Sequence, residues 1–165
     1  TQCIHQIKAM NCVKFLSQHC AEQVPENALT YHINTSHPPA RFCHDISQGV
    51  HEGWTVTHAA LQIAYYLGFK MVIIIGLDHR YKYDGAPNEA HILEGPDPNH
   101  FSPDYFGHGQ QWDNPDLARA EESFRIARAE FEKDGRRIID ATLDGACTVF
   151  EKASFAELVK SQASL

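Results

Sequence analysis

The residues best suited to chemistry lie in one long irregular stretch, residues 79–113. It holds four of the eleven histidines together with tyrosines, phenylalanines and a tryptophan, and proline, glycine and aspartate interrupt it. Histidine titrates near neutral pH and serves as a general acid, a general base or a metal ligand. Loops of this length are uncommon in compact domains and usually form active-site lids or binding loops. The aromatic content is too high for a solvated linker, so we expect an ordered active-site loop.

The histidines could in principle bind a metal, but their spacing matches no known site. The sequence has no HExxH, no HxH and no Cys/His pair at the spacing of a zinc finger. The five cysteines are an odd number without a CxxC pair, which argues against a disulfide framework and a zinc ribbon. We therefore predict no metal site, and reduced thiols in a cytoplasmic protein.

A helix, a tight turn and a strand within residues 55–78 must position this loop. Thr55 suits the N-cap of the helix, and Gly68 suits its end. The apolar run at residues 71–77 has no polar alternation, so both faces of this strand should be buried, as in the centre of a parallel sheet. One apolar face of the helix is predicted from residues at the helical period: Val56, Ala60, Ile63 and Leu67.

A second amphipathic helix is predicted over residues 116–133, with Asn114 as N-cap and Pro115 at its first position. Short strands are expected at residues 29–34 and 136–142. The order helix, strand, long loop, helix and strand indicates βαβ construction, and so a doubly wound, mainly parallel sheet in one α/β domain over residues 1–165. The apolar face of the second helix is predicted to contain Leu117, Ala120, Phe124, Ala127 and Phe131.

Composition and charge exclude several classes of protein. With 43% hydrophobic residues, the chain is long and apolar enough to form one domain core. A formal charge of −7 argues against electrostatic binding of nucleic acid. The longest apolar run is too short to cross a bilayer, and no signal peptide opens the sequence. Peripheral membrane contact and a homo-oligomer stay open.

Three stretches of the sequence together resemble a known family. They are AALQIAYYLGFKMVIIIGLDHRY, NHFSPDYFG and GRRIIDATLDGACTVFEKASF. They resemble the Rossmann-like family of unknown function that includes the archaeal 6-hydroxymethylpterin diphosphokinases and bacterial motility accessory proteins. The first stretch is also similar to the bacterial lipooligosaccharide sialyltransferases. The resemblance covers residues 53–155 and implies a Rossmann-like fold with helices on both faces of the sheet.

The resemblance implies a nucleotide-dependent transferase, above all a sialyltransferase-like glycosyltransferase of surface polysaccharide or glycan biosynthesis. In the sialyltransferases, two tyrosines beyond the strand contact the donor phosphate, and a histidine in the following loop is the general base. Tyr81 and Tyr83 stand in the tyrosine region, and His100 and His108 are the two candidates for the base. We favour His100, because prolines bracket and stiffen its surroundings, whereas His108 lies between two glycines.

Further residues are predicted to bind the substrate or its nucleotide. A helix N-terminus offers backbone N–H groups to an anion, and open α/β sheets bind ligands beyond the carboxyl ends of their strands. The predicted binding residues at these two places and beside His100 are Thr55, Thr57, Asp78, His79, Asn99 and Tyr105.

Two other functions stay open. Diphosphoryl transfer from ATP to a pterin would need Mg²⁺, for which Asp78, Asp84 and Asp97 could supply ligands. A non-catalytic module could instead bind a sugar with its aromatic loop. No tightly bound cofactor is predicted, because a nucleotide-sugar donor and a glycan acceptor would be substrates.

One departure from the family concerns nucleotide binding. The family carries a Gly-Asn-Gly-Pro-Ser-like nucleotide-binding turn that this sequence lacks, and the sequence has no GxGxxG and no Walker motif. The chain also opens within a probable helix at Thr1. We therefore expect a C-terminal fragment of the full domain, which by itself binds nucleotides weakly.

Overall fold

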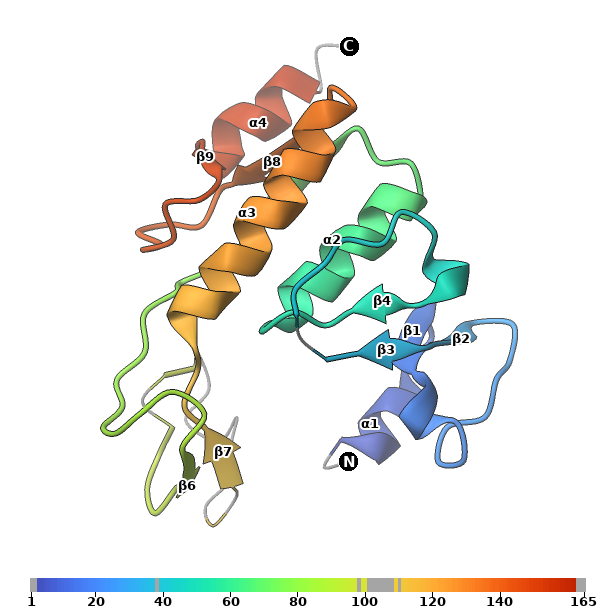
Figure 1. Ribbon diagram of the computed structural model, residues 1–165, viewed down its shortest axis with the longest axis vertical. Coiled ribbons are helices and arrows are strands. Elements are labelled where there is room, and N and C mark those ends of the chain that lie inside the picture. The colour runs from blue at the N-terminus through green and yellow to red at the C-terminus, as the bar shows by residue number, and fades with distance from the viewer. Residues whose placement is uncertain (1–2, 38, 98, 101–108, 110, 163–165) are drawn as a thin grey trace. The chain divides into compact units, whose positions relative to one another are not determined.

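The structure, a computed structural model, describes residues 3–37, 39–97, 99–100, 109 and 111–162. The chain divides into two compact units, Thr1–Phe69 and Lys70–Leu165, which are described one at a time. Figure 1 shows the elements of each unit in the colour order of the chain. The single domain over residues 1–165 stays a prediction.

The described part of unit 1 contains two small pairs of parallel strands, two α-helices and two short 3₁₀ helices. Strand β1 pairs with β2, and β3 pairs with β4. One residue separates β2 from β3, so the chain passes directly from one pair to the other, and the hydroxyls of Ser17 and Thr35 lie 3.0 Å apart between them. Strand β2 confirms the strand expected at residues 29–34. In chain order, the elements are α1 (Ile4–Ala9), β1 (Lys14–Ser17), η1 (Gln18–Cys20), β2 (Thr30–Ile33), β3 (Thr35–Ser36), η2 (Ile46–Gln48), β4 (Val50–His51) and α2 (Val56–Tyr66).

Helix α2 forms where it was predicted, but it buries a different face. Its buried side chains are those of His58, Leu61 and Gln62. Of the predicted apolar face, Val56 is 84% exposed and Leu67 is 53% exposed. The predicted orientation of this helix is therefore wrong, because its buried face is the one that hydrogen-bonds to the backbone of neighbouring segments.

Gln62 makes most of these hydrogen bonds. Its Oε1 accepts from the backbone N–H groups of Cys43 (3.0 Å) and His51 (3.1 Å). Its Nε2 donates to the backbone carbonyls of His51 (2.7 Å) and His58 (3.1 Å). The ring Nε2 of His58 lies 2.8 Å from the carbonyl of Arg41, which can only accept. Because the buried amide is fully hydrogen-bonded, its burial costs little.

Unit 2 is built on a parallel sheet of three strands. Strand β8 lies between β5 and β9 and pairs in parallel with both, while β6 and β7 form a separate antiparallel pair. The unit is thus a mixed α/β structure whose main sheet is parallel, as predicted. Its elements are β5 (Met71–Ile74), β6 (Ala90–Ile92), β7 (Gln111–Asp113), α3 (Leu117–Lys133), β8 (Arg137–Asp140), β9 (Glu151–Lys152) and α4 (Phe155–Gln162).

Strand β5 lies at an edge of this sheet rather than in its centre. Among the described residues it pairs with β8 alone, and its four residues are only half buried. Ile75, which follows, is 65% exposed. The prediction of a fully buried interior strand over residues 71–77 is wrong. The buried central strand is β8, because it pairs on both sides, and its Ile139 is fully buried.

Helix α3 lies against β8 and buries the face that its sequence predicts (Figure 1). Its buried residues are Ala120, Ser123, Phe124, Ala127 and Phe131. The ring of Phe124 lies 5.3 Å from that of Phe150. These aromatic side chains make up much of the core of unit 2.

The N-cap of α3 is Asp116 and not Asn114. The Asp116 carboxylate accepts a hydrogen bond of 3.1 Å from the backbone N–H of Arg119. Asn114 instead donates from Nδ2 to the carbonyls of Asp84 (2.8 Å) and Ala86 (2.9 Å). The N-cap therefore lies two residues later than predicted, because Asn114 holds the preceding loop, and the helix itself begins one residue later, at Leu117.

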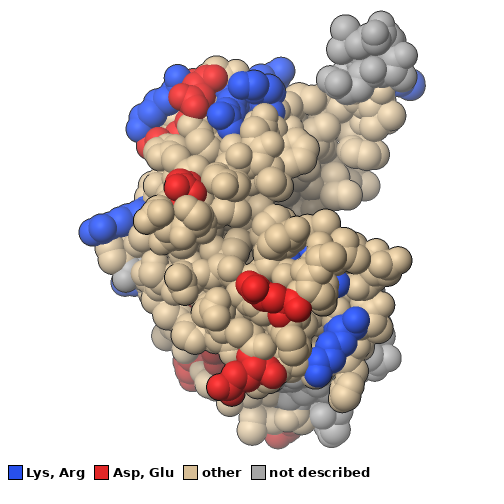
Figure 2. Space-filling view, turned by 90° about the vertical axis from the view of Figure 1, so that its right-hand side faces the viewer, with Lys and Arg blue, Asp and Glu red and all other residues tan. Residues whose placement is uncertain are grey.

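The distribution of charged side chains and the lengths of the helices are relevant to the partners that the protein could bind. Figure 2 shows Lys and Arg side chains scattered among Asp and Glu on a face formed largely by uncharged residues. Within the described part of the chain, no helix is both long enough and apolar enough to span a membrane.

Candidate active site

Asp97 and His100 form a hydrogen-bonded pair in the loop after β6. The Asp97 side chain is 3% exposed, and its Oδ2 lies 2.7 Å from Nδ1 of His100. Its Oδ1 accepts a hydrogen bond of 2.8 Å from the backbone N–H of Asn99, which turns the chain back towards the carboxylate. When Asp97 is ionised, its carboxylate can only accept, and Nδ1 of His100 then carries the hydrogen. A neutral His100 then has its basic lone pair on Nε2.

Asn99 fixes this pair against the segment that follows β5. Its Oδ1 accepts from the backbone N–H of Lys82 (2.7 Å), and its Nδ2 donates to the Lys82 carbonyl (3.1 Å). The ring of Tyr81 stands edge-on to that of His100, with centroids 6.5 Å apart. Two segments seventeen residues apart in the chain are thus joined. The structure therefore brings Tyr81, Asn99 and His100 of the predicted site together.

Tyr83 lies in a different environment from Tyr81. Its hydroxyl donates to the carbonyl of Pro115, just before α3, at 3.3 Å. In an extended segment, successive side chains point to opposite faces, and side chains two residues apart point to the same face. Here the two tyrosines nevertheless have different partners, so they are not equivalent members of one phosphate site.

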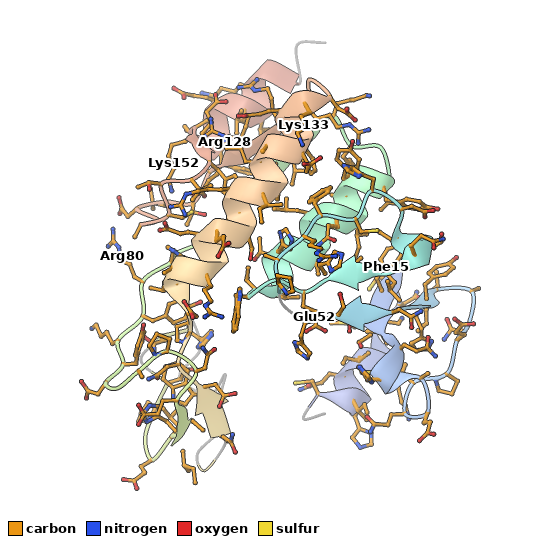
Figure 3. All side chains as sticks on the ribbon, in the orientation of Figure 1. Phe15, Glu52, Arg80, Arg128, Lys133 and Lys152 are labelled. Carbon is orange, nitrogen blue, oxygen red and sulfur yellow. The ribbon has the colours of Figure 1, made fainter. Side chains whose placement is uncertain are left out.

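The residues at the end of β5 are tied to the loop after β8. The backbone N–H of Leu77 donates to the hydroxyl of Thr142 (2.9 Å), and that of Ala146 donates to the carbonyl of Asp78 (2.8 Å). Arg80, on the loop after β5 in Figure 3, donates to the carbonyl of Asp144 at 2.6 Å. These bonds hold the exposed Asp78 at the carboxyl end of the sheet.

His79 turns inward at this point. Its φ of 53° is uncommon for a residue other than glycine. Its side chain is 7% exposed, and its ring lies 6.0 Å from that of Phe124 on α3. Its Nε2 is 3.3 Å from Oε1 of Glu121 but has no partner with hydrogen-bond geometry among the described residues. At this distance His79 and Glu121 form an ion pair only when His79 is protonated.

The end of β8 carries a buried carboxylate that the sequence did not single out. Asp140 is 1% exposed, and its Oδ2 lies 2.5 Å from Nζ of Lys152 on β9 (Figure 3). Its Oδ1 accepts from the backbone N–H of Thr142 at 2.9 Å. Nearby, burial raises the pKa of the Cys147 thiol, which keeps it protonated and unreactive. Asp140 and Lys152 therefore fix the strand ends.

The remaining predicted residues lie elsewhere. Thr55 and Thr57 belong to unit 1, where the Thr55 hydroxyl caps α2 by accepting from the backbone N–H of Thr57 (3.3 Å). One of the N–H groups expected to meet an anion thus has an internal partner. Tyr105 and His108 lie outside the described residues.

From its sequence context, Asp97 is predicted only as a possible magnesium ligand. Its pairing with His100 could have been found from the DPNH segment, since an aspartate three residues before a histidine is within reach when the aspartate caps the turn. In the described part of the chain, no three His, Cys, Asp or Glu side chains form a group that could hold a metal ion.

Comparison with known proteins gives no match. No family model matches the sequence, and no curated protein or solved structure is significantly similar to it. The resemblance described above thus rests on its three sequence motifs.

Proposed function

We propose that this protein is a nucleotide-dependent transferase of the glycosyltransferase type, with His100 as its general base. The observation that carries this proposal is the 2.7 Å hydrogen bond between Nδ1 of His100 and the buried Asp97. A general base must be held in place and must present a basic atom in the right tautomer. Asp97 meets both needs, in the manner of the aspartate in a hydrolase triad.

In the proposed reaction, Nε2 of His100 takes the proton of an acceptor hydroxyl. The acceptor oxygen forms a bond to the anomeric carbon of the donor sugar, and the bond from that carbon to the donor phosphate breaks. The electron pair of the broken bond leaves with the nucleotide. Asp97 stabilises the imidazolium that forms, and the hydroxyl of Tyr81, beside His100, donates a hydrogen bond to the departing phosphate.

The proposed fold is the Rossmann-like doubly wound sheet of the resembled family, acting in the cytoplasm. The parallel pairing of β5 with β8, with α3 between them in the chain, supports such a sheet. The five cysteines are all free, which agrees with a reducing compartment.

The first test incubates the protein with a panel of nucleotide sugars. Release of the free nucleotide measures turnover of each donor. His100→Ala should lower kcat by roughly 10²–10⁴-fold, the usual worth of a positioned base. Asp97→Asn should also lower kcat, because an amide no longer fixes the Nδ1–H tautomer. The ¹⁵N chemical shifts of His100 should report that tautomer in the parent protein and its loss in Asp97→Asn. His37→Ala, at a side chain that is 86% exposed in unit 1, is the matched control and should retain full activity.

Three outcomes would move the assignment. Full activity of His100→Ala would remove the base from this position. Strict dependence on ATP and Mg²⁺ would favour diphosphoryl transfer. Sugar binding without turnover of any donor would favour the binding module.

A further inference from the structure

A pocket of about 310 Å³ lies beside the β6–β7 pair. The register of the pair sets His91 directly opposite Trp112, and their ring centroids are 6.2 Å apart. The other described lining residues are Tyr83, Asp84, Ile92, Leu93, Glu94 and Asn114. The volume is at the small end of ligand sites and is enough for a sugar ring.

Two buried polar atoms of the pocket residues have no hydrogen-bond partner among the described residues. They are Oδ1 of Asn114 and Nε2 of His91. Asn114 is 1% exposed, and its Nδ2 donates to two carbonyls, those of Asp84 and Ala86. Turning the amide over would set its oxygen against both carbonyls, so Oδ1 is fixed as an acceptor without a donor. Leaving such a group unsatisfied costs about 1–3 kcal/mol, which a ligand hydroxyl would recover if the pocket wall shifts to admit it to this atom, whose exposed area is below 1 Å².

The composition of the pocket indicates the chemical class of that ligand. Trp112 and Tyr83 offer aromatic surface to the C–H face of a sugar ring. A sugar hydroxyl both donates and accepts, so it matches the Asn114 oxygen and either state of His91. Asp84 and Glu94 accept from hydroxyls but repel phosphate and carboxylate groups. The pocket is therefore suited to a neutral saccharide and not to a nucleotide.

We infer that this pocket binds a neutral saccharide, the acceptor of the transfer reaction. The assignment as acceptor rests on the proposed function, whereas the saccharide binding itself does not. Tyr83 in the pocket follows Lys82, which Asn99 holds, and Tyr81 stands beside His100. The three-residue segment 81–83 thus connects the pocket to the proposed base.

The test uses the two tryptophans of the chain as paired reporters. Methyl β-D-galactopyranoside, N-acetylglucosamine and maltotriose are titrated separately while the indole N–H signals are followed by NMR. At least one of them should shift the Trp112 signal, and the Trp54 signal, from unit 1, should stay in place. CMP, ADP and inorganic phosphate should leave the Trp112 signal unchanged.

A matched pair of variants locates the binding. His91→Phe keeps an aromatic ring opposite Trp112 but removes Nε2, and it should raise the dissociation constant roughly tenfold. Asp113→Asn is the control, since Asp113 is exposed on the other side of β7 from Trp112, and it should bind like the parent. If His91→Phe does not fold, the comparison of saccharides with phosphates in the parent protein still decides.

The inference is overturned if no saccharide moves the Trp112 signal, if a nucleotide moves it more than any saccharide, or if a folded His91→Phe binds as well as the parent. It fails separately from the proposed function. Saccharide binding without donor turnover would retain the pocket and remove the transferase, whereas His100-dependent turnover with an unchanged Trp112 signal would do the reverse.

Discussion

Helices α2 and α3 have similar apolar patterns but bury faces of opposite character. Helix α3 buries phenylalanine and alanine against β8, whose backbone is already hydrogen-bonded to strands on both sides. Helix α2 buries Gln62 and His58 beside β4, a strand of two residues that leaves neighbouring backbone groups without sheet partners. Buried backbone groups need partners. The helix face that is buried therefore depends on what the adjacent backbone requires, and periodicity alone does not reveal it.

The largest expected effect comes from the apolar side of this comparison. Phe131→Ala should lower the free energy of unfolding by about 3–5 kcal/mol, because it removes a fully buried ring and leaves a cavity. Denaturant unfolding measures the loss, and hydrogen exchange should place it in α3 and β8. Phe155→Ala, at a ring that is 50% exposed on α4, is the control and should cost far less. Equal losses in the two variants would mean that Phe131 is not a core residue.

The second prediction tests the polar side. Gln62→Leu keeps much of the side-chain volume but removes all four hydrogen bonds to the backbone, so we expect a loss of about 2–3 kcal/mol. The amides of Cys43 and His51 should lose protection from hydrogen exchange. Gln48→Leu, at an exposed position, is the matched control. If Gln62→Leu is neutral or stabilising, the difference between the two helices is not required for stability, because α2 could then bury an apolar face as well as a polar one.

The sequence predicted the helices and strands of this protein better than their surroundings. Helix α3 has the expected bounds and buried face. It packs on β8, whose backbone already pairs with strands on both sides, so apolar periodicity alone determines which face is buried. Strand β5 was expected in the sheet centre because its apolar run resembles a buried strand, but pairing between distant segments decides which strand is central. A local pattern carries no information about such pairing.

The candidate site was predictable only in part, for a similar reason. His100 and Tyr81 were singled out as residue types that suit the chemistry. Asp97 as the partner of His100 and Asn99 as a link to Lys82 depend on the turn geometry of the loop. The pocket lined by His91 and Trp112 depends on the register of β6 and β7, which short strands in an irregular stretch do not reveal.

A smaller effect is expected at the start of α3. Asp116→Ala should cost about 1 kcal/mol, since the carboxylate caps the backbone N–H of Arg119. Asp116→Ser keeps a capping oxygen and should lose only a few tenths of that amount. Thermal unfolding compares the two variants. If serine costs as much as alanine, the Asp116 side chain acts through its charge and not as a cap.

The smallest expected effect is a pH dependence of the free energy of unfolding that arises from His51, beside α2. Burial, and next the charge of Arg41, lower the pKa of His51, whose backbone is bonded to Gln62. The unfolded state, near the ordinary value of 6.5, then binds a proton more readily than the folded state, so stability is lost as the pH falls below about 6.5 towards the lowered value. His51→Asn keeps an acceptor for the Ser36 hydroxyl, which lies 2.8 Å from Nδ1 of His51, but does not titrate. The free energy of unfolding should therefore fall more steeply between pH 7 and pH 5 in the parent than in this variant. Every other residue is the same in both proteins, so its contribution cancels in the difference. Parallel curves would show that His51 is as solvated when folded as when unfolded, and the polar packing around α2 would then be looser than its hydrogen bonds indicate.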